Sequence, residues 1–109
     1  MRSDELLIAK TESAFRSVNE RIVESATSVG ASEAEFVCEC DDPGCGRRIT
    51  APIDDYERVR SNGARFLVAP EHEEQGHEEV LASRPGYRII EKLRAVGAAA
   101  RRLSPRPAR

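Results

Sequence analysis

The sequence predicts an α+β protein in which a long N-terminal amphipathic helix precedes a small antiparallel or mixed sheet with one short helix. Two observations lead to this fold class. Residues 3–29 carry apolar side chains at helical spacing without an internal proline or glycine. After residue 30, short apolar runs alternate with turn residues. We therefore expect an N-terminal helix in residues 1–30, an α+β domain in residues 31–93 and a basic, disordered tail in residues 94–109.

The N-terminal helix is expected over residues 3–29, ending at Gly30. One apolar stripe should run along it, made of Leu7, Phe15, Val18, Ile22 and Val29. About 25 helical residues would make a rod about 38 Å long at 1.5 Å per residue, which would exceed the width of the remaining small domain. We therefore expect part of it to pack on a protein partner or on a second copy. The alternative, a helix lying only on its own domain, stays open because Thr11 and Ser25 interrupt a coiled-coil pattern.

The rest of the chain predicts short strands around one helix. Residues 35–39 and 47–51 are expected to form a hairpin, and residues 53–61 a short helix beginning after Pro52. Residues 64–69 indicate a buried strand and residues 87–93 a last strand. Residues 78–83 fit either a helix or a strand.

The three cysteines of the chain occupy the tip of the predicted hairpin, in the pattern Cys-x-Cys-x4-Cys. Cys38 and Cys40 lie two residues apart on an extended chain, so they face the same way. Cys45 returns after a turn of Asp, Pro and Gly residues. Three soft donors within eight residues predict a zinc site that needs one more ligand. His72, at the end of a predicted strand, is the favoured fourth ligand, and His77 is the alternative.

Four ligands of this kind favour a structural zinc ion, one per chain, over a catalytic one. Buried unligated thiols and an iron–sulfur cluster are weaker interpretations, because the segment is polar and the usual cluster spacings differ. A zinc-dependent enzyme would need a general base, for which Glu39, Glu71 and Glu73 are candidates. The sequence lacks the histidine spacing of metalloproteases and the motif of zinc deaminases. We expect no catalysis.

Charge is distributed unevenly along the chain. The formal net charge is −2, yet residues 94–109 hold five arginines and no acid, which leaves −7 for residues 1–93. The basic tail suggests a nucleic-acid-associated regulator as an alternative function, although an acidic body predicts weak binding. No apolar run is long enough for a membrane span, and no signal segment is recognisable, so we expect a cytoplasmic protein without a membrane partner. The leading hypothesis is a zinc-binding protein-interaction or regulatory module.

Two resemblances bear on the site. The cysteine pattern locally resembles the zinc knuckle of the post-SET segments of histone methyltransferases, which implies metal binding and no methyltransferase activity. More extensively, Phe-Val-Cys-Glu-Cys, Arg-Phe-Leu-Val-Ala-Pro and Tyr-Arg-Ile-Ile-Glu-Lys, within residues 18–92, resemble a family of small uncharacterised bacterial proteins, mainly actinobacterial. That resemblance implies that His72 joins the cysteines. This chain has Ala-Pro-Glu-His where the family pattern has Pro-Gly-His.

Overall fold

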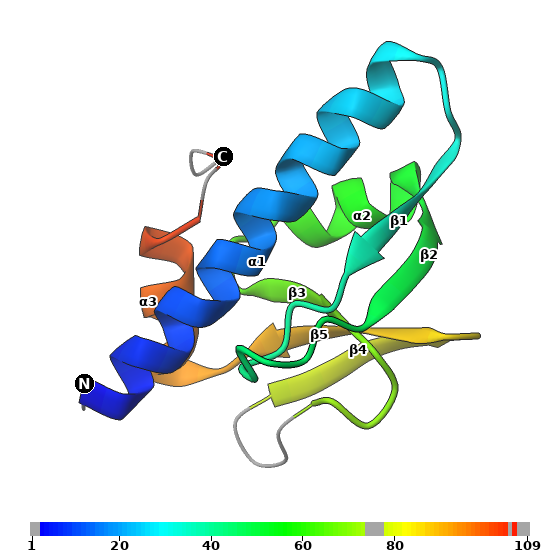
Figure 1. The fold of residues 1–109 in the computed structure, drawn as a ribbon. Coiled ribbons are helices and arrows are strands. Elements are labelled where there is room, and N and C mark those ends of the chain that lie inside the picture. Colours follow the sequence, from blue (N-terminus) through cyan, green and yellow to red (C-terminus); the bar gives the residue numbers. More distant parts are fainter. Residues whose placement is uncertain (1–2, 74–77, 105, 107–109) are drawn as a thin grey trace.

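Along the chain, one helix precedes two small sheets and another follows them. The computed structural model describes residues 3–73, 78–104 and 106. In chain order the elements are α1 (Ser3–Ser28), β1 (Glu33–Val37), β2 (Arg48–Pro52), α2 (Ile53–Arg60), β3 (Arg65–Val68), β4 (Glu78–Arg84), β5 (Tyr87–Lys92) and α3 (Arg94–Arg102), as Figure 1 shows. The α+β fold class predicted from the sequence is confirmed.

The strands form two antiparallel sheets where one sheet was expected. β1 pairs with β2, and the second sheet has the strand order β3-β5-β4. The segment that fitted either a helix or a strand is β4, an edge strand with a register shift between Val80 and Ala82. The chain crosses from the first sheet to the second through α2, so the cysteine hairpin and the histidine-bearing loop belong to different sheets (Figure 1).

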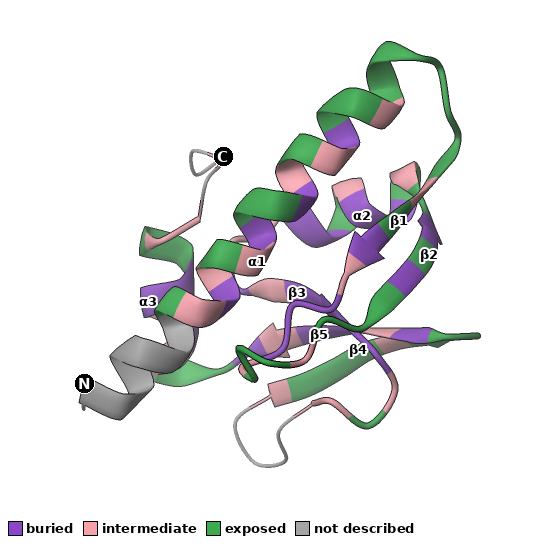
Figure 2. Cartoon of the chain, in the orientation of Figure 1, coloured by how far each residue is buried: buried purple, intermediate pink, exposed green. Residues whose placement is uncertain are grey.

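One core joins the two sheets. On β1 and β2 the side chains alternate, so that Phe36, Ile49 and Ala51 point inward while their neighbours face solvent. Phe36 stacks on Tyr56 of α2 with ring centroids 4.5 Å apart. β3 is buried almost throughout and supplies Phe66 to the same core (Figure 2).

Helix α1 lies along its own domain and buries a face other than the predicted stripe. The buried residues recur at helical spacing, and most are polar: Glu12, Arg16, Asn19 and Val23. Of the predicted stripe, Val18 and Val29 are 45% and 79% exposed, Phe15 and Ile22 are half-buried, and the side chain of Leu7 lies outside the described ones. The stripe is therefore only partly buried, and α1 meets the core through the neighbouring face, where its polar residues bind groups on other elements. No helix in the described ranges is long and apolar enough to cross a membrane.

Residues 94–102, expected to belong to a disordered tail, form α3 instead. Ala99 and Ala100 are buried, and Gly97 packs so closely that an added Cβ would lie 2.5 Å from the Lys92 carbonyl oxygen. Alanine is the best helix former, and its small side chain lets a helix approach closely, so a segment poor in large apolar residues still packs. Beyond α3, the Arg106 guanidinium binds Glu57, with its Nη1 atom 2.8 Å from Oε2, and Glu20.

Candidate metal centre

The structure brings Cys38, Cys40, Cys45 and His72 together. Their ligand atoms all lie within 4.8 Å of one another, and among the described residues they form a group that could hold a metal ion. Cys38 and Cys40 follow β1, and Cys45 lies in the turn before β2. His72 follows β3, as predicted from the sequence. The alternative ligand, His77, lies outside the described residues.

Local hydrogen bonds shape the cysteine loop. The Cys38 N–H donates to the Arg47 carbonyl at 2.8 Å, which closes the hairpin beside the first ligand. Inside the loop, Asp42 accepts from the Gly44 N–H through Oδ1 at 2.9 Å and from the Cys45 N–H through its carbonyl at 3.1 Å. A short aspartate side chain that binds its own backbone two residues on is typical of such turns. These local bonds therefore help to hold Cys45 within the loop.

His72 is placed by a tight turn at the end of β3. Its N–H donates to the Ala69 carbonyl at 3.0 Å, with Pro70 second and Glu71 third in the turn. Glu71 has a φ of 69°, the left-handed conformation that a type II turn requires at this position and that glycine normally supplies. This chain thus adopts the turn with a strained residue next to a ligand.

The distances fit a tetrahedral ion. His72 Nδ1 lies 3.6 Å from Cys38 Sγ and 3.5 Å from Cys45 Sγ. Sulfur at 2.3 Å and nitrogen at 2.0–2.1 Å from a tetrahedral zinc ion would be about 3.6 Å apart. Two thiolates on such an ion would be about 3.8 Å apart, so the widest pair of the cluster needs to close by no more than about 1 Å.

Burial sets the protonation of the thiols. Burial raises the pKa of Cys38, opposed by N–H donors that include the Ala69 amide, 3.2 Å from its sulfur. Burial likewise raises the pKa of Cys40. These two thiols therefore hold their protons at neutral pH unless a cation replaces them. Metal binding at this cluster would release protons, as thiolate sites do.

Glu39, between two of the cysteines, anchors the cluster to the rest of the fold. The residue is fully buried, because alternation on an extended chain turns it away from the cysteine face. Its Oε2 atom accepts from Asn19 Nδ2 at 2.8 Å and from the Tyr56 hydroxyl at 2.6 Å, and its Oε1 atom accepts from the Leu67 N–H at 2.9 Å. The donors come from α1, α2 and β3. Glu39 thus links the ligand-bearing segment to three elements.

Sequence reasoning missed this role of Glu39 and the part played by Asn19. The signal was a charged residue alternating with two ligands on an extended segment, which places its carboxylate toward the core. Burial, followed by the negative charge of Glu39, raises the pKa of Tyr56, so the hydroxyl stays a donor. The other two residues considered as a catalytic base are placed differently: Glu73 is ion-paired with Arg88, and Glu71 forms the turn.

Comparison with protein-family models, with curated proteins and with solved structures gives no match. The resemblances to known families therefore stay predictions, and the function is inferred from the geometry of the site.

Proposed function

We propose that this chain is a small zinc-stapled protein-interaction module, in which the ion is structural. The observation that supports the proposal is the convergence of three sulfur atoms and one imidazole nitrogen at near-tetrahedral spacing. Thiolate and imidazole are the donors of structural zinc sites, and four of them leave no position for water or substrate. Their net charge with zinc, about −1, also suits a structural ion better than a Lewis acid.

The ion would have a mechanical task. It would tie the β1–β2 hairpin to the turn after β3, and these segments belong to different sheets. A two-stranded sheet is marginally stable alone, so a link to its neighbour matters in a chain of 109 residues.

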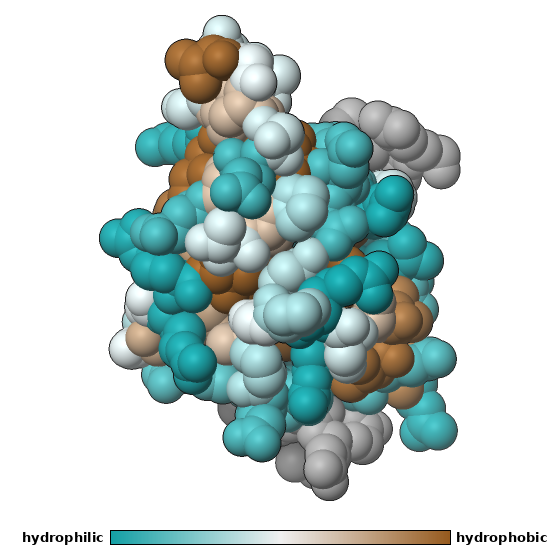
Figure 3. All heavy atoms as spheres, turned by 90° about the vertical axis from the view of Figure 1, so that its right-hand side faces the viewer, coloured by the Kyte–Doolittle hydropathy of each residue, from teal (hydrophilic) through white to brown (hydrophobic). Residues whose placement is uncertain are grey.

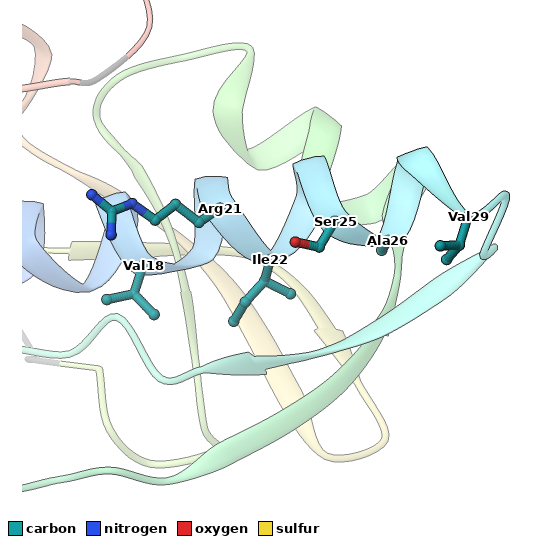
Figure 4. A pocket seen from close by; sticks show the side chains of 6 residues that line it. All are labelled: Val18, Arg21, Ile22, Ser25, Ala26 and Val29. Atoms are coloured by element: carbon teal, nitrogen blue, oxygen red, sulfur yellow. The ribbon is translucent and has the colours of Figure 1, made fainter.

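The face that remains for a partner is the exposed flank of α1. Val18, Ile22, Ala26 and Val29 line an open, mainly apolar groove there together with Arg21 and Ser25 (Figure 4). From that side, hydrophobic residues run down from the top of the molecule between polar ones (Figure 3). Exposed apolar patches of this kind mark interaction sites. We assign this groove to a protein partner or a second copy.

Metal analysis of the reduced, purified chain tests the zinc assignment. We expect about one zinc ion per chain, because four protein ligands complete one tetrahedral site. Cys40→Ser should lose the metal and several kcal/mol of unfolding free energy, since metal binding at such sites is coupled to folding. Asp54→Ser, outside the cluster, is the matched control and should keep the metal. Protein without zinc, and indifferent to added zinc or cobalt, would contradict the proposal.

Weak nucleic-acid binding is the second candidate, favoured by the exposed Arg101 and Arg102 at the end of α3. Arg106 contributes less, because Glu20 and Glu57 already bind its guanidinium. The test is Arg101→Gln with Arg102→Gln, which leaves the packing of α3 intact. Unchanged affinity for DNA and RNA at low salt would remove this candidate.

A further inference from the structure

Strand β1 has an open edge. The Cys38 N–H donates to Arg47, and the Ile53 N–H donates to the Ser32 carbonyl. Because antiparallel strands alternate hydrogen-bonded and non-hydrogen-bonded pairs, the even-numbered residues of β1 bond to β2. The N–H and C=O groups of Glu33, Glu35 and Val37 therefore point away from β2.

A side chain already occupies one position on this edge. Asn19 of α1 accepts from the Val37 N–H at 2.8 Å and donates to the Val37 carbonyl at 2.9 Å. Its amide thus makes the two hydrogen bonds that a neighbouring strand would make. The next two outward positions, at Glu33 and Glu35, have no such substitute among the described residues. Both residues are exposed.

Helix α1 overhangs the same edge. The sheet turns Ala34 and Phe36 toward the core and Glu33 and Glu35 toward solvent. The apolar groove of α1 lies beside β1, because the side chains of Val18 and Ile22 point toward the ribbon of β1 (Figure 4). Ile22 also packs against the core, as Ala34 of β1 does. A third strand beside β1 would therefore find main-chain partners along one edge and an apolar surface for every second side chain.

We propose that this edge binds an extended segment of another protein in which apolar and basic residues alternate. The apolar side chains would fill the groove of α1, and the basic ones would lie opposite Glu33 and Glu35, since cross-strand pairs of opposite charge are favourable. The ion pair between Glu35 and Arg48 does not prevent Glu35 from pairing with a basic residue of the partner, because both side chains are more than half exposed and such pairs are weak.

Charge argues against a second copy as the occupant. Pairing β1 with β1 of another chain would set the acidic residues of one strand opposite those of the other, which is unfavourable. The inference rests on the proposed role as an interaction module and names the partner chemistry for it. It does not depend on the identity of the metal.

The probe is the peptide acetyl-Lys-Val-Lys-Val-Lys-amide, titrated into metal-loaded protein and followed by amide NMR and hydrogen exchange. We expect saturable shifts and slower exchange at Glu33 and Glu35. The double variant Glu33→Lys with Glu35→Lys should bind this probe about tenfold more weakly and should prefer acetyl-Glu-Val-Glu-Val-Glu-amide, because the cross-strand charges are reversed. Both changes are on the solvent face, so the fold should be retained.

Two further variants locate the binding site. Ile22→Ser should weaken binding at least about fivefold by removing apolar surface from the groove. Val80→Ser is the matched control, because Val80 is similarly apolar, is 42% exposed and lies on β4, an edge strand of the second sheet. It should leave the affinity unchanged. Metal content and circular dichroism of each variant show whether it is folded, so loss of zinc and loss of peptide binding are separate results.

Three outcomes would overturn the inference: shifts that map to β4, no saturable shift up to about 1 mM peptide, or dimers in sedimentation that protect the same amides without peptide. The last result would make a second copy the occupant.

A peptide N-methylated on the amides that face β1 should not bind, whereas one methylated on the opposite amides should, because only the first loses the main-chain bonds.

Discussion

At Glu12 a carboxylate is buried between α1 and the second sheet. Lys92 Nζ lies 2.7 Å from its Oε2 atom and also binds Glu78, and all three side chains are at most 3% exposed. Two carboxylates thus share one ammonium group in a site that excludes water. Burial raises the pKa of Glu12 to about 7, opposed by Lys92 and Arg16 and reinforced by Asp41.

This arrangement predicts a pH dependence of stability. The folded chain holds the Glu12 proton up to about pH 7, whereas the unfolded chain releases it near its ordinary pKa of 4.5. Between those values the folded state binds more protons, so stability falls as pH rises, by at most about 3 kcal/mol. Glu12→Gln should remove this component and should be the more stable protein at pH 8. Urea unfolding of both proteins from pH 5 to 8 tests this prediction. The difference between their unfolding free energies isolates the contribution of Glu12, because the metal ligands contribute equally to both. If the unfolding free energies of the two proteins changed with pH in the same way, the assignment to Glu12 would be contradicted.

The turn before His72 makes a second prediction at the scale of one residue. Glu71 has a φ of 69°, which costs about 1 kcal/mol in a residue with a Cβ, and glycine avoids that cost. Because glycine also loses more chain entropy on folding, we expect Glu71→Gly to stabilise the metal-loaded protein by about 0.5 kcal/mol. The same change at Glu79, exposed on β4, should destabilise it by about 0.5–1 kcal/mol. Thermal unfolding distinguishes the two variants by sign, and an equal loss in both would rule out strain at Glu71.

At the scale of the elements, local chemistry was predictable and long-range partnership was not. The spacing of the cysteines, the turn residues between them and the apolar run before His72 are all local signals, and they predicted the members of the cluster. Asn19 and Glu39 are polar residues whose burial depends on each other across 20 positions, so neither sequence neighbourhood indicates it. For the same reason the mostly polar buried face of α1 was not predicted.

The link between α1 and the hairpin can be tested through Asn19. Asn19→Ala would remove three hydrogen bonds, two to Val37 and one to Glu39, and would leave buried polar groups without partners. We expect a loss of about 3 kcal/mol in unfolding free energy. Metal affinity should also fall, because Glu39 is held between two ligands. Ser17→Ala, on the exposed face of the same helix, should change stability by less than about 0.5 kcal/mol. If Asn19→Ala left the metal affinity unchanged, α1 would not contribute to the stability of the metal site.

At the scale of the whole molecule, the cluster and the core connect the same two sheets in different ways. A single set of buried side chains runs from Phe36 on β1 to Ile90 on β5. Most members of this set lie outside the cluster, and Cys38 and Cys40 are the two ligands that belong to both. The cysteine loop after Cys40 and the turn carrying His72 lie at the border of this core, with Cys45 only partly buried against it.

Chelation should therefore open the molecule in stages. We expect removal of the proposed zinc ion to speed hydrogen exchange first at the amides of Cys45 and His72, whose bonds lie within the loop and the turn. The amide of Ile90, in the central strand of the second sheet, should exchange only through global unfolding, at a rate that reflects the several kcal/mol lost with the metal. Hydrogen exchange measured by NMR, with and without chelator, gives the exchange rates of the loop and turn amides and of the Ile90 amide on one sample. The control is Cys40→Ser, in which chelator should change neither rate. If all three amides accelerate together and by the same factor, the ion supports the core itself and is more than a link between its two sheets.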